Sequence, residues 1–186
     1  MLKKILLAIL SLIVILIGVV VVLAMAVSPE YKVEREITIQ RPKSDVFAYV
    51  KKLKNQNSWG PWFKKDPAMK QEFKGEDGFI GFTSAWTSDH PDVGEGEQEI
   101  KNIVEGSRMD TELRFIKPFA STNQAFITTE AVGADSTRVR WGFSGAMPRP
   151  MNIMMLFMDM DKEVGKDFDE GLSNLKRILE TPPTIN

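Results

Sequence analysis

The chain contains no cysteine and a single histidine, His90. The lack of cysteine excludes disulfides, thiolate metal sites and a cysteine nucleophile. One histidine also argues against a zinc site, and a Ser-His-Asp triad would have to use it. His90 stands among turn-forming residues in Ser88-Asp89-His90-Pro91-Asp92, a pattern typical of a solvent-exposed loop. We therefore expect no metal and no cofactor.

Two binding signals are also missing. Gly75, Gly78 and Gly81 are closely spaced, but they lie at strand ends and lack the following helix that a phosphate would need. A basic surface for nucleic acid is missing as well. Only 22 of the 24 basic residues follow residue 27, whereas all 25 acidic residues do, so this part of the chain is net negative. We expect no nucleic-acid partner.

Charge is absent from Ile5 to Val27, where only Ser11 and Gly18 interrupt an apolar run. As a helix, these 23 residues would span roughly 35 Å, enough for a hydrocarbon core of about 30 Å. A cleaved signal peptide is the alternative, with Ala24-Met25-Ala26 as its cleavage site. The run is longer than a usual signal core, so we favour a retained transmembrane anchor over residues 1–28 and a folded domain over 29–186.

The anchor predicts a single-pass membrane protein. Lys3 and Lys4 precede the apolar run directly, which favours a cytoplasmic N-terminus and an extracytoplasmic domain. Basic residues also follow the run, and a folded domain of this length can be translocated largely regardless of its charge. The membrane is therefore one expected partner, through the N-terminal helix.

The domain reads as strands framed by two helices. Apolar residues alternate from Tyr31 to Ile39, as in a half-buried strand, and a helix is predicted after Pro42. The segment 55–67 reads as irregular. Strand-like runs follow at about 69–75, 79–88, 95–104, 107–116, 122–132 and 136–144. Their spacing predicts one seven-stranded antiparallel sheet, built as a meander.

The C-terminal part predicts a long helix. Apolar residues recur every three or four positions over about seven turns: Met154, Phe157, Met160, Val164, Phe168, Leu172, Leu175 and Leu179. Asn152 is the expected N-cap, and Pro182-Pro183 blocks continuation. This apolar stripe must be buried, and the concave face of the sheet is the available partner.

The order of elements and several short motifs resemble one superfamily. The motifs are Val46-Phe47, Trp59-Gly60-Pro61-Trp62, Asp66-Pro67, Gly94-Glu95-Gly96 with Ile100, Leu113, Phe115 and Pro118, Thr137-Arg138-Val139-Arg140-Trp141 with Gly145, Gly165-Lys166-Asp167-Phe168, and Gly171-Leu172 with Asn174-Leu175-Lys176. Over about residues 31–180 the chain resembles the START-like superfamily, also called Bet v 1-like, polyketide cyclase/dehydrase-like or SRPBCC, and its membrane-anchored bacterial members of uncharacterised role. The resemblance implies an α+β helix-grip fold with a deep apolar cavity between the sheet and the long helix.

We expect this cavity to be lined by aromatic, apolar and amide side chains: Trp59, Trp62, Trp86, Gln98, Ile100, Phe115, Trp141, Phe143, Met154, Phe157 and Met160. Ordinary core packing is the competing interpretation for the tryptophans. Six methionines between Met147 and Met160 would suit an adaptable wall, although a plain core also uses them. Trp59 and Trp62, with Lys64 and Lys65, are predicted to form a gate at the cavity mouth that faces the membrane.

Three functions remain open. The leading hypothesis is a membrane-tethered binding protein that holds an apolar small molecule or lipid, without a catalytic residue. The second is a metal-free cyclase or hydratase in which Glu130, Gln98, Arg114 or Arg140 points inward and acts in acid-base chemistry. The third is a protein-interaction module with a collapsed cavity.

Overall fold

The computed structural model describes residues 1–181 and contains seven strands, five α-helices and two 3₁₀ turns within them. Pro182 and Pro183, expected to end the last helix, lie outside this range. The elements, in chain order, are α1 (Leu2–Ala26), β1 (Glu30–Ile39), α2 (Lys43–Val50), η1 (Leu53–Asn55), α3 (Gln56–Trp59), α4 (Trp62–Lys65), β2 (Lys70–Lys74), β3 (Thr83–Thr87), β4 (Glu95–Val104), β5 (Arg108–Lys117), β6 (Ser121–Gly133), β7 (Ser136–Ala146), η2 (Met151–Leu156) and α5 (Met160–Glu180).

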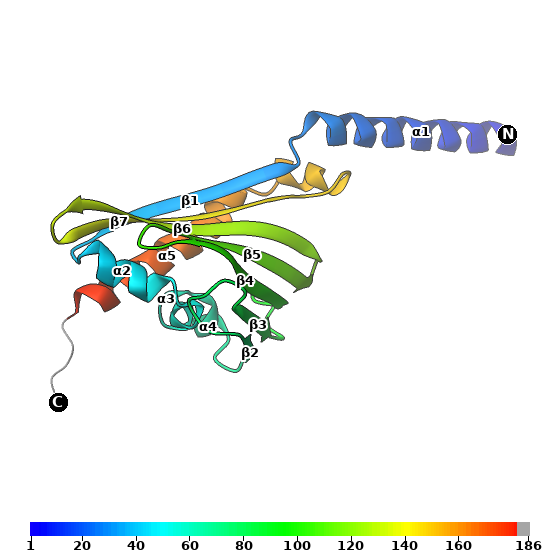
Figure 1. Cartoon of the computed structure of the whole chain (residues 1–186). Helices are drawn as coiled ribbons and strands as arrows, with labels where there is room; N and C mark the ends of the chain where they lie inside the picture. Colours follow the sequence, from blue (N-terminus) through cyan, green and yellow to red (C-terminus); the bar gives the residue numbers. More distant parts are fainter. Residues whose placement is uncertain (182–186) are drawn as a thin grey trace.

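All seven strands form one antiparallel sheet in the order β1-β7-β6-β5-β4-β3-β2. Strands β2 to β7 are a meander, and β1 pairs with β7 from Glu30↔Ala146 to Ile39↔Thr137. The sheet curves, and α5 runs along its concave face (Figure 1). The predicted helix-grip architecture is confirmed.

The long helix begins later than the sequence predicts. Asn152 is not its N-cap, because residues 151–156 form the separate turn η2. The cap is Asp159, whose side chain accepts a hydrogen bond from the Lys162 backbone N–H at 3.1 Å. An aspartate caps well, and two acidic residues in the first turn favour the positive end of the helix dipole. Met154 and Phe157 therefore lie outside α5.

The inner face of the sheet is packed tightly at the end that lies far from α1. Helix α2 contributes Val46, Phe47 and Val50, and α5 contributes Leu172 and Leu175. Together with strand residues such as Ile39 and Ile127, these side chains are buried. The expected irregular segment 55–67 is in fact folded into the short turns η1, α3 and α4, which lie beside α5 and below the sheet in Figure 1.

Helix α1 extends away from the rest of the molecule (Figure 1). Of its 25 residues only Ala24 is buried. Within residues 1–181 it is the one helix that is long and apolar enough to cross a membrane, a test that a signal sequence near an N-terminus also passes.

Candidate functional site

A cavity of about 290 Å³ lies between the concave face of the sheet, the turns α3 and α4, and the first half of α5. Its wall is mostly apolar. Six of the eleven predicted residues line it: Trp62, Trp86, Gln98, Phe115, Trp141 and Phe143. The interior is therefore not collapsed, which contradicts the interaction-module hypothesis in the form predicted from the sequence.

An aromatic wall crosses the sheet at the cavity. Trp86 on β3 contacts Phe115 on β5 edge-to-face with ring centroids 5.8 Å apart, and Phe115 contacts Phe143 on β7 at 6.5 Å. Gly96 on β4 makes room for this arrangement, because a Cβ there would lie 2.7 Å from the Trp86 ring. Edge-to-face pairs are favourable for aromatic quadrupoles, so the three rings hold one another in place.

The back of the cavity is an aromatic cluster around Trp141. Its ring stacks on Phe168 of α5 at 3.8 Å and meets the edges of Trp59 and Trp62 at 4.8 and 5.6 Å. Trp62 reaches the cavity, whereas Trp59 and Ile100 are fully buried in the surrounding core. The prediction that Trp59 lies at the cavity mouth is wrong. Its indole packs against Trp141, so the residue belongs to the core.

The two lysines of the predicted gate are bound to α5. Lys65 Nζ lies 2.8 Å from the Asp167 carboxylate, and Lys64 Nζ lies 3.3 Å from that of Glu170. These ion pairs tie α4 to the long helix beside the cavity. Both lysines, which were predicted to face a membrane surface, are therefore paired with carboxylates of α5.

Met154, Phe157 and Met160 do not reach the cavity. Met154 and Phe157 are exposed, and Phe157 and Met160 border a separate surface groove beside the start of β1. The reason is the break between η2 and α5, which removes these side chains from the helix stripe that faces the sheet.

Polar groups in the cavity wall are mostly amides. Gln98 Nε2 donates to the Thr111 hydroxyl at 3.0 Å, and the Asn57 and Gln71 amides bond each other. The ionisable side chains of the wall are Asp92, which is exposed, and Asp167, which pairs with Lys65. Neutral wall groups of this kind suit a neutral or weakly polar ligand.

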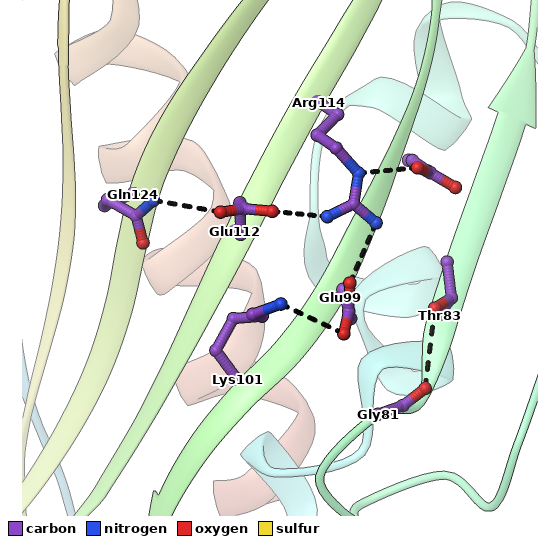
Figure 2. Close-up of polar contacts among 8 residues, drawn as sticks. Gly81, Thr83, Glu99, Lys101, Glu112, Arg114 and Gln124 are labelled. Atoms are coloured by element: carbon purple, nitrogen blue, oxygen red, sulfur yellow. Dashed lines mark hydrogen bonds and ion pairs between the residues drawn. The ribbon is translucent and has the colours of Figure 1, made fainter.

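Three of the four acid-base candidates point away from the cavity. Arg114 lies on the outer face of the sheet, where it bonds Glu99 and Glu112 (Figure 2). The hydrogen bond to Glu97 at 2.6 Å, together with those to Glu99 and Glu112, raises the pKa of the Arg114 guanidinium, and the bond from Arg114 lowers the pKa of the Glu99 carboxyl. Glu130 pairs with Arg138 at 3.2 Å, and Arg140 pairs with Glu36 at 2.9 Å, both on exposed surfaces.

The two faces of β4 differ in charge. The three glutamates of Glu95 to Glu99 lie outside with Arg114 and Lys117, and Gln98 lies inside. His90 is in the β3–β4 loop, where its Nδ1 accepts the Asp92 backbone N–H at 3.2 Å. Among residues 1–181, no three acidic or histidine side chains gather where they could hold a metal ion.

The cavity wall also contains residues that were not predicted from the sequence, including Leu113, Val164 and Phe168. The signals were available. Leu113 is two positions from Phe115 and therefore on the same strand face, and Val164 and Phe168 lie one helical turn apart on the apolar stripe.

Comparison with known proteins identifies the family of this chain. Residues 30–180 match the model of the family described as polyketide cyclase / dehydrase and lipid transport. The chain belongs to this family. No curated protein matches it.

Solved structures share the fold. A protein from Nitrosospira multiformis matches with a TM-score of 0.58 at 17% identity, covering 79% of this chain and 94% of that one. Ara h 8.0201 matches with 0.54 at 14% identity, covering 81% and 97%. Norcoclaurine synthase from Thalictrum flavum, in complex with dopamine and hydroxybenzaldehyde, matches with 0.56 at 12% identity, covering 87% and 93%. At 12–17% identity these matches show a shared fold, and the family assignment rests on the match over residues 30–180.

Proposed function

We propose that this chain is a membrane-tethered binding protein that holds one apolar small molecule or lipid chain between its sheet and α5. The observation that carries the proposal is the cavity of about 290 Å³, walled by aromatic rings and amides. Its volume is near the lower end of the usual range for ligand pockets, about 300–1,000 Å³, so the ligand is small or enters only in part.

The chemistry of the wall favours a ligand with one polar group. The Trp86, Phe115 and Phe143 rings would contact its apolar part. Gln98 could bond a hydroxyl, carbonyl or amide, because its nitrogen donates to Thr111 and its side-chain oxygen accepts no hydrogen bond from residues 1–181. The norcoclaurine synthase complex with dopamine and hydroxybenzaldehyde supports a small ligand for this fold.

Helix α1 supplies the tether in this proposal. Residues 1–28 would cross the membrane with the N-terminus in the cytoplasm, and residues 29–186 would form the binding domain outside it. The tether would keep the cavity near molecules dissolved in the bilayer and so raise their effective concentration at the site.

The test uses the full chain in lipid nanodiscs and cis-parinaric acid, a fluorescent fatty acid excited by energy transfer from tryptophan. All four tryptophans lie after α1, so transfer reports on the domain. Ser84→Phe would place a ring into the cavity, and Ala85→Phe is the matched control because Ala85 is next on β3 and faces Glu97 on the outer side.

We expect saturable transfer in the parent chain and in Ala85→Phe, and at least a several-fold loss of affinity in Ser84→Phe. Leu113→Phe narrows the same cavity from β5 and serves if Ser84→Phe lowers the thermal midpoint. Equal transfer in all the folded variants would contradict binding in this cavity.

A further inference from the structure

An apolar rim is exposed where η2 meets α1. It consists of Met151, Met154, Leu156, Phe157 and Met158, all exposed, with 86% of Phe157 open to solvent. No charged residue occurs from Pro150 to Met158. Five exposed apolar side chains within eight residues form a surface of the kind that marks contact with a partner or a membrane. We call these five residues the η2 rim.

The η2 rim is fixed to the end of α1 by hydrogen bonds. Asn152 is fully buried, and its Nδ2 donates to the carbonyl oxygens of Ala24 at 2.9 Å and Val27 at 2.8 Å. Arg149 Nε donates to the same Ala24 oxygen at 2.8 Å. The last carbonyls of a helix lack partners within the helix and are costly to leave unpaired near hydrocarbon. Asn152 and Arg149 satisfy the carbonyls of Ala24 and Val27 and hold η2 against the end of the helix.

The contact between η2 and the end of α1 lies at the depth expected for the edge of a bilayer's hydrocarbon core. Ile5 to Ala24 is a run of 20 residues, or about 30 Å of helix, which equals the usual hydrocarbon thickness. If Lys4 remains at one surface, Ala24 reaches the other. The η2 rim, attached at Ala24, then lies at the boundary between headgroups and acyl chains.

A second exposed ring lies at the same end of the sheet. Phe119 is 67% exposed in the turn between β5 and β6. The register places this turn at the same end of the sheet as the start of β1, since Gln124 pairs with Ser144 and Glu30 pairs with Ala146. In Figure 1 the β5–β6 turn and η2 both lie at the end of the sheet from which α1 departs.

We infer that the η2 rim inserts into the bilayer interface beside α1 and seats the domain on the membrane with a fixed orientation. This inference rests on the proposed tether and adds a second membrane contact to it. The lipid bilayer is the partner that fits, because the rim is continuous with the apolar surface of α1 and lies at interfacial depth. Seating would turn the β3–β4 loop, which borders the cavity through Asp92 and Val93, toward the lipid.

The experiment exploits the lack of native cysteine. Single variants Val14→Cys, Phe119→Cys, Phe157→Cys and Phe79→Cys of the full chain carry an environment-sensitive NBD label in vesicles of phosphatidylcholine and phosphatidylglycerol. Quenching by lipids brominated on their acyl chains then reports contact with the hydrocarbon. Phe79 is the matched control, because it is 56% exposed but lies in the β2–β3 connection, at the opposite end of the sheet.

We expect strong quenching at Val14 and quenching at Phe157 that exceeds the Phe79 value several-fold, with Phe119 between them. If the Val14 label is quenched but the Phe157 label is quenched no more than the Phe79 label, insertion of the η2 rim would be contradicted. The proposed transmembrane tether would still stand. A Phe157 label shielded from water but not quenched would indicate a protein contact and also contradict insertion of the η2 rim. A Val14 label that is not quenched would remove the tether, and the seat with it.

Discussion

The two ends of the concave sheet face are covered by the same helix but filled differently. Far from α1, the C-terminal half of α5 and the apolar face of α2 pack against the strands, and Phe47, Leu172 and Leu175 are fully buried. Near α1, the first half of α5 and the turn α4 stand over Trp86, Phe115 and Phe143, and the cavity remains between them.

The difference lies in how the covering elements are held. At the packed end, apolar contacts hold α2 and α5, and the Lys176 Nζ donates to the Thr38 carbonyl at 2.6 Å. At the cavity end, ion pairs contribute: Arg35 binds Asp161 at 2.8 Å and Asp169 at 3.3 Å, and Lys65 binds Asp167. Charged side chains at the edge can fix a helix above a sheet without filling the space beneath it. The cavity end thus gives up packing and gains room for a ligand.

The largest effect is expected from Phe47→Ala at the packed end. Removing a buried ring leaves a cavity that the neighbouring side chains fill only in part, at a cost of about 3–5 kcal/mol. Denaturant unfolding followed by far-ultraviolet circular dichroism measures this loss. Phe47→Leu, which keeps most of the volume, should cost less than half as much. A loss below about 1 kcal/mol for Phe47→Ala would show that this end is not tightly packed.

Phe115→Ala is the matching substitution at the cavity end, and its cost should be smaller. Phe115 already borders the cavity and gives up mainly its edge contacts with Trp86 and Phe143, so we expect about 1–2 kcal/mol. Affinity for cis-parinaric acid should fall several-fold. If unfolding data showed a loss equal to that of Phe47→Ala with unchanged probe affinity, the two ends would not differ as described.

Gly165→Ala tests how closely α5 approaches the sheet at the cavity end. A Cβ at this position would collide with the Arg35 guanidinium, which binds Asp161 and Asp169. The guanidinium is the end of a flexible side chain, so we expect it to swing aside and its solvent-exposed ion pairs to break. The loss of stability should be small, because alanine also favours the helix more than glycine does. Combining it with Arg35→Ala should recover part of that loss in thermal unfolding. No recovery would indicate that the clash lies elsewhere.

The smallest effect concerns pH. The hydrogen bond from Arg35 lowers the pKa of the Asp161 carboxyl. Because the folded pKa is below the ordinary value of about 3.9, the pair stabilises the fold above that pH, and this contribution is lost as the pH falls through the folded pKa. Both partners are open to water, so the effect is modest. The difference in thermal midpoint between the parent chain and Asp161→Asn should shrink from pH 6 to pH 3; a constant difference would exclude this linkage.

Periodicity predicted most of the fold because it records which face of each element is buried. Alternation in Tyr31 to Ile39 located β1, and the stripe through Phe168, Leu172 and Leu175 located α5. The same method extended α5 too far, because η2 also carries apolar residues at helical spacing. It cannot distinguish a stripe that faces the sheet from one that faces outward.

The candidate site was harder to predict. Strand residues such as Trp86 and Phe143 were placed correctly from their alternation, whereas Trp59 was assigned to the rim because its neighbours in the chain are polar. Its burial depends on Trp141 and Phe168, which are distant in sequence. Likewise, nothing in the local sequence indicates that Asn152 bonds the end of α1, more than 120 residues earlier.

The most direct test of the central claim is native mass spectrometry of the full chain, released from membranes and compared with Ser84→Phe and Ala85→Phe. We expect one apolar molecule per chain in the parent protein and in Ala85→Phe, and none in Ser84→Phe. A parent protein that carries no apolar molecule and takes up none from added lipid extract would contradict it.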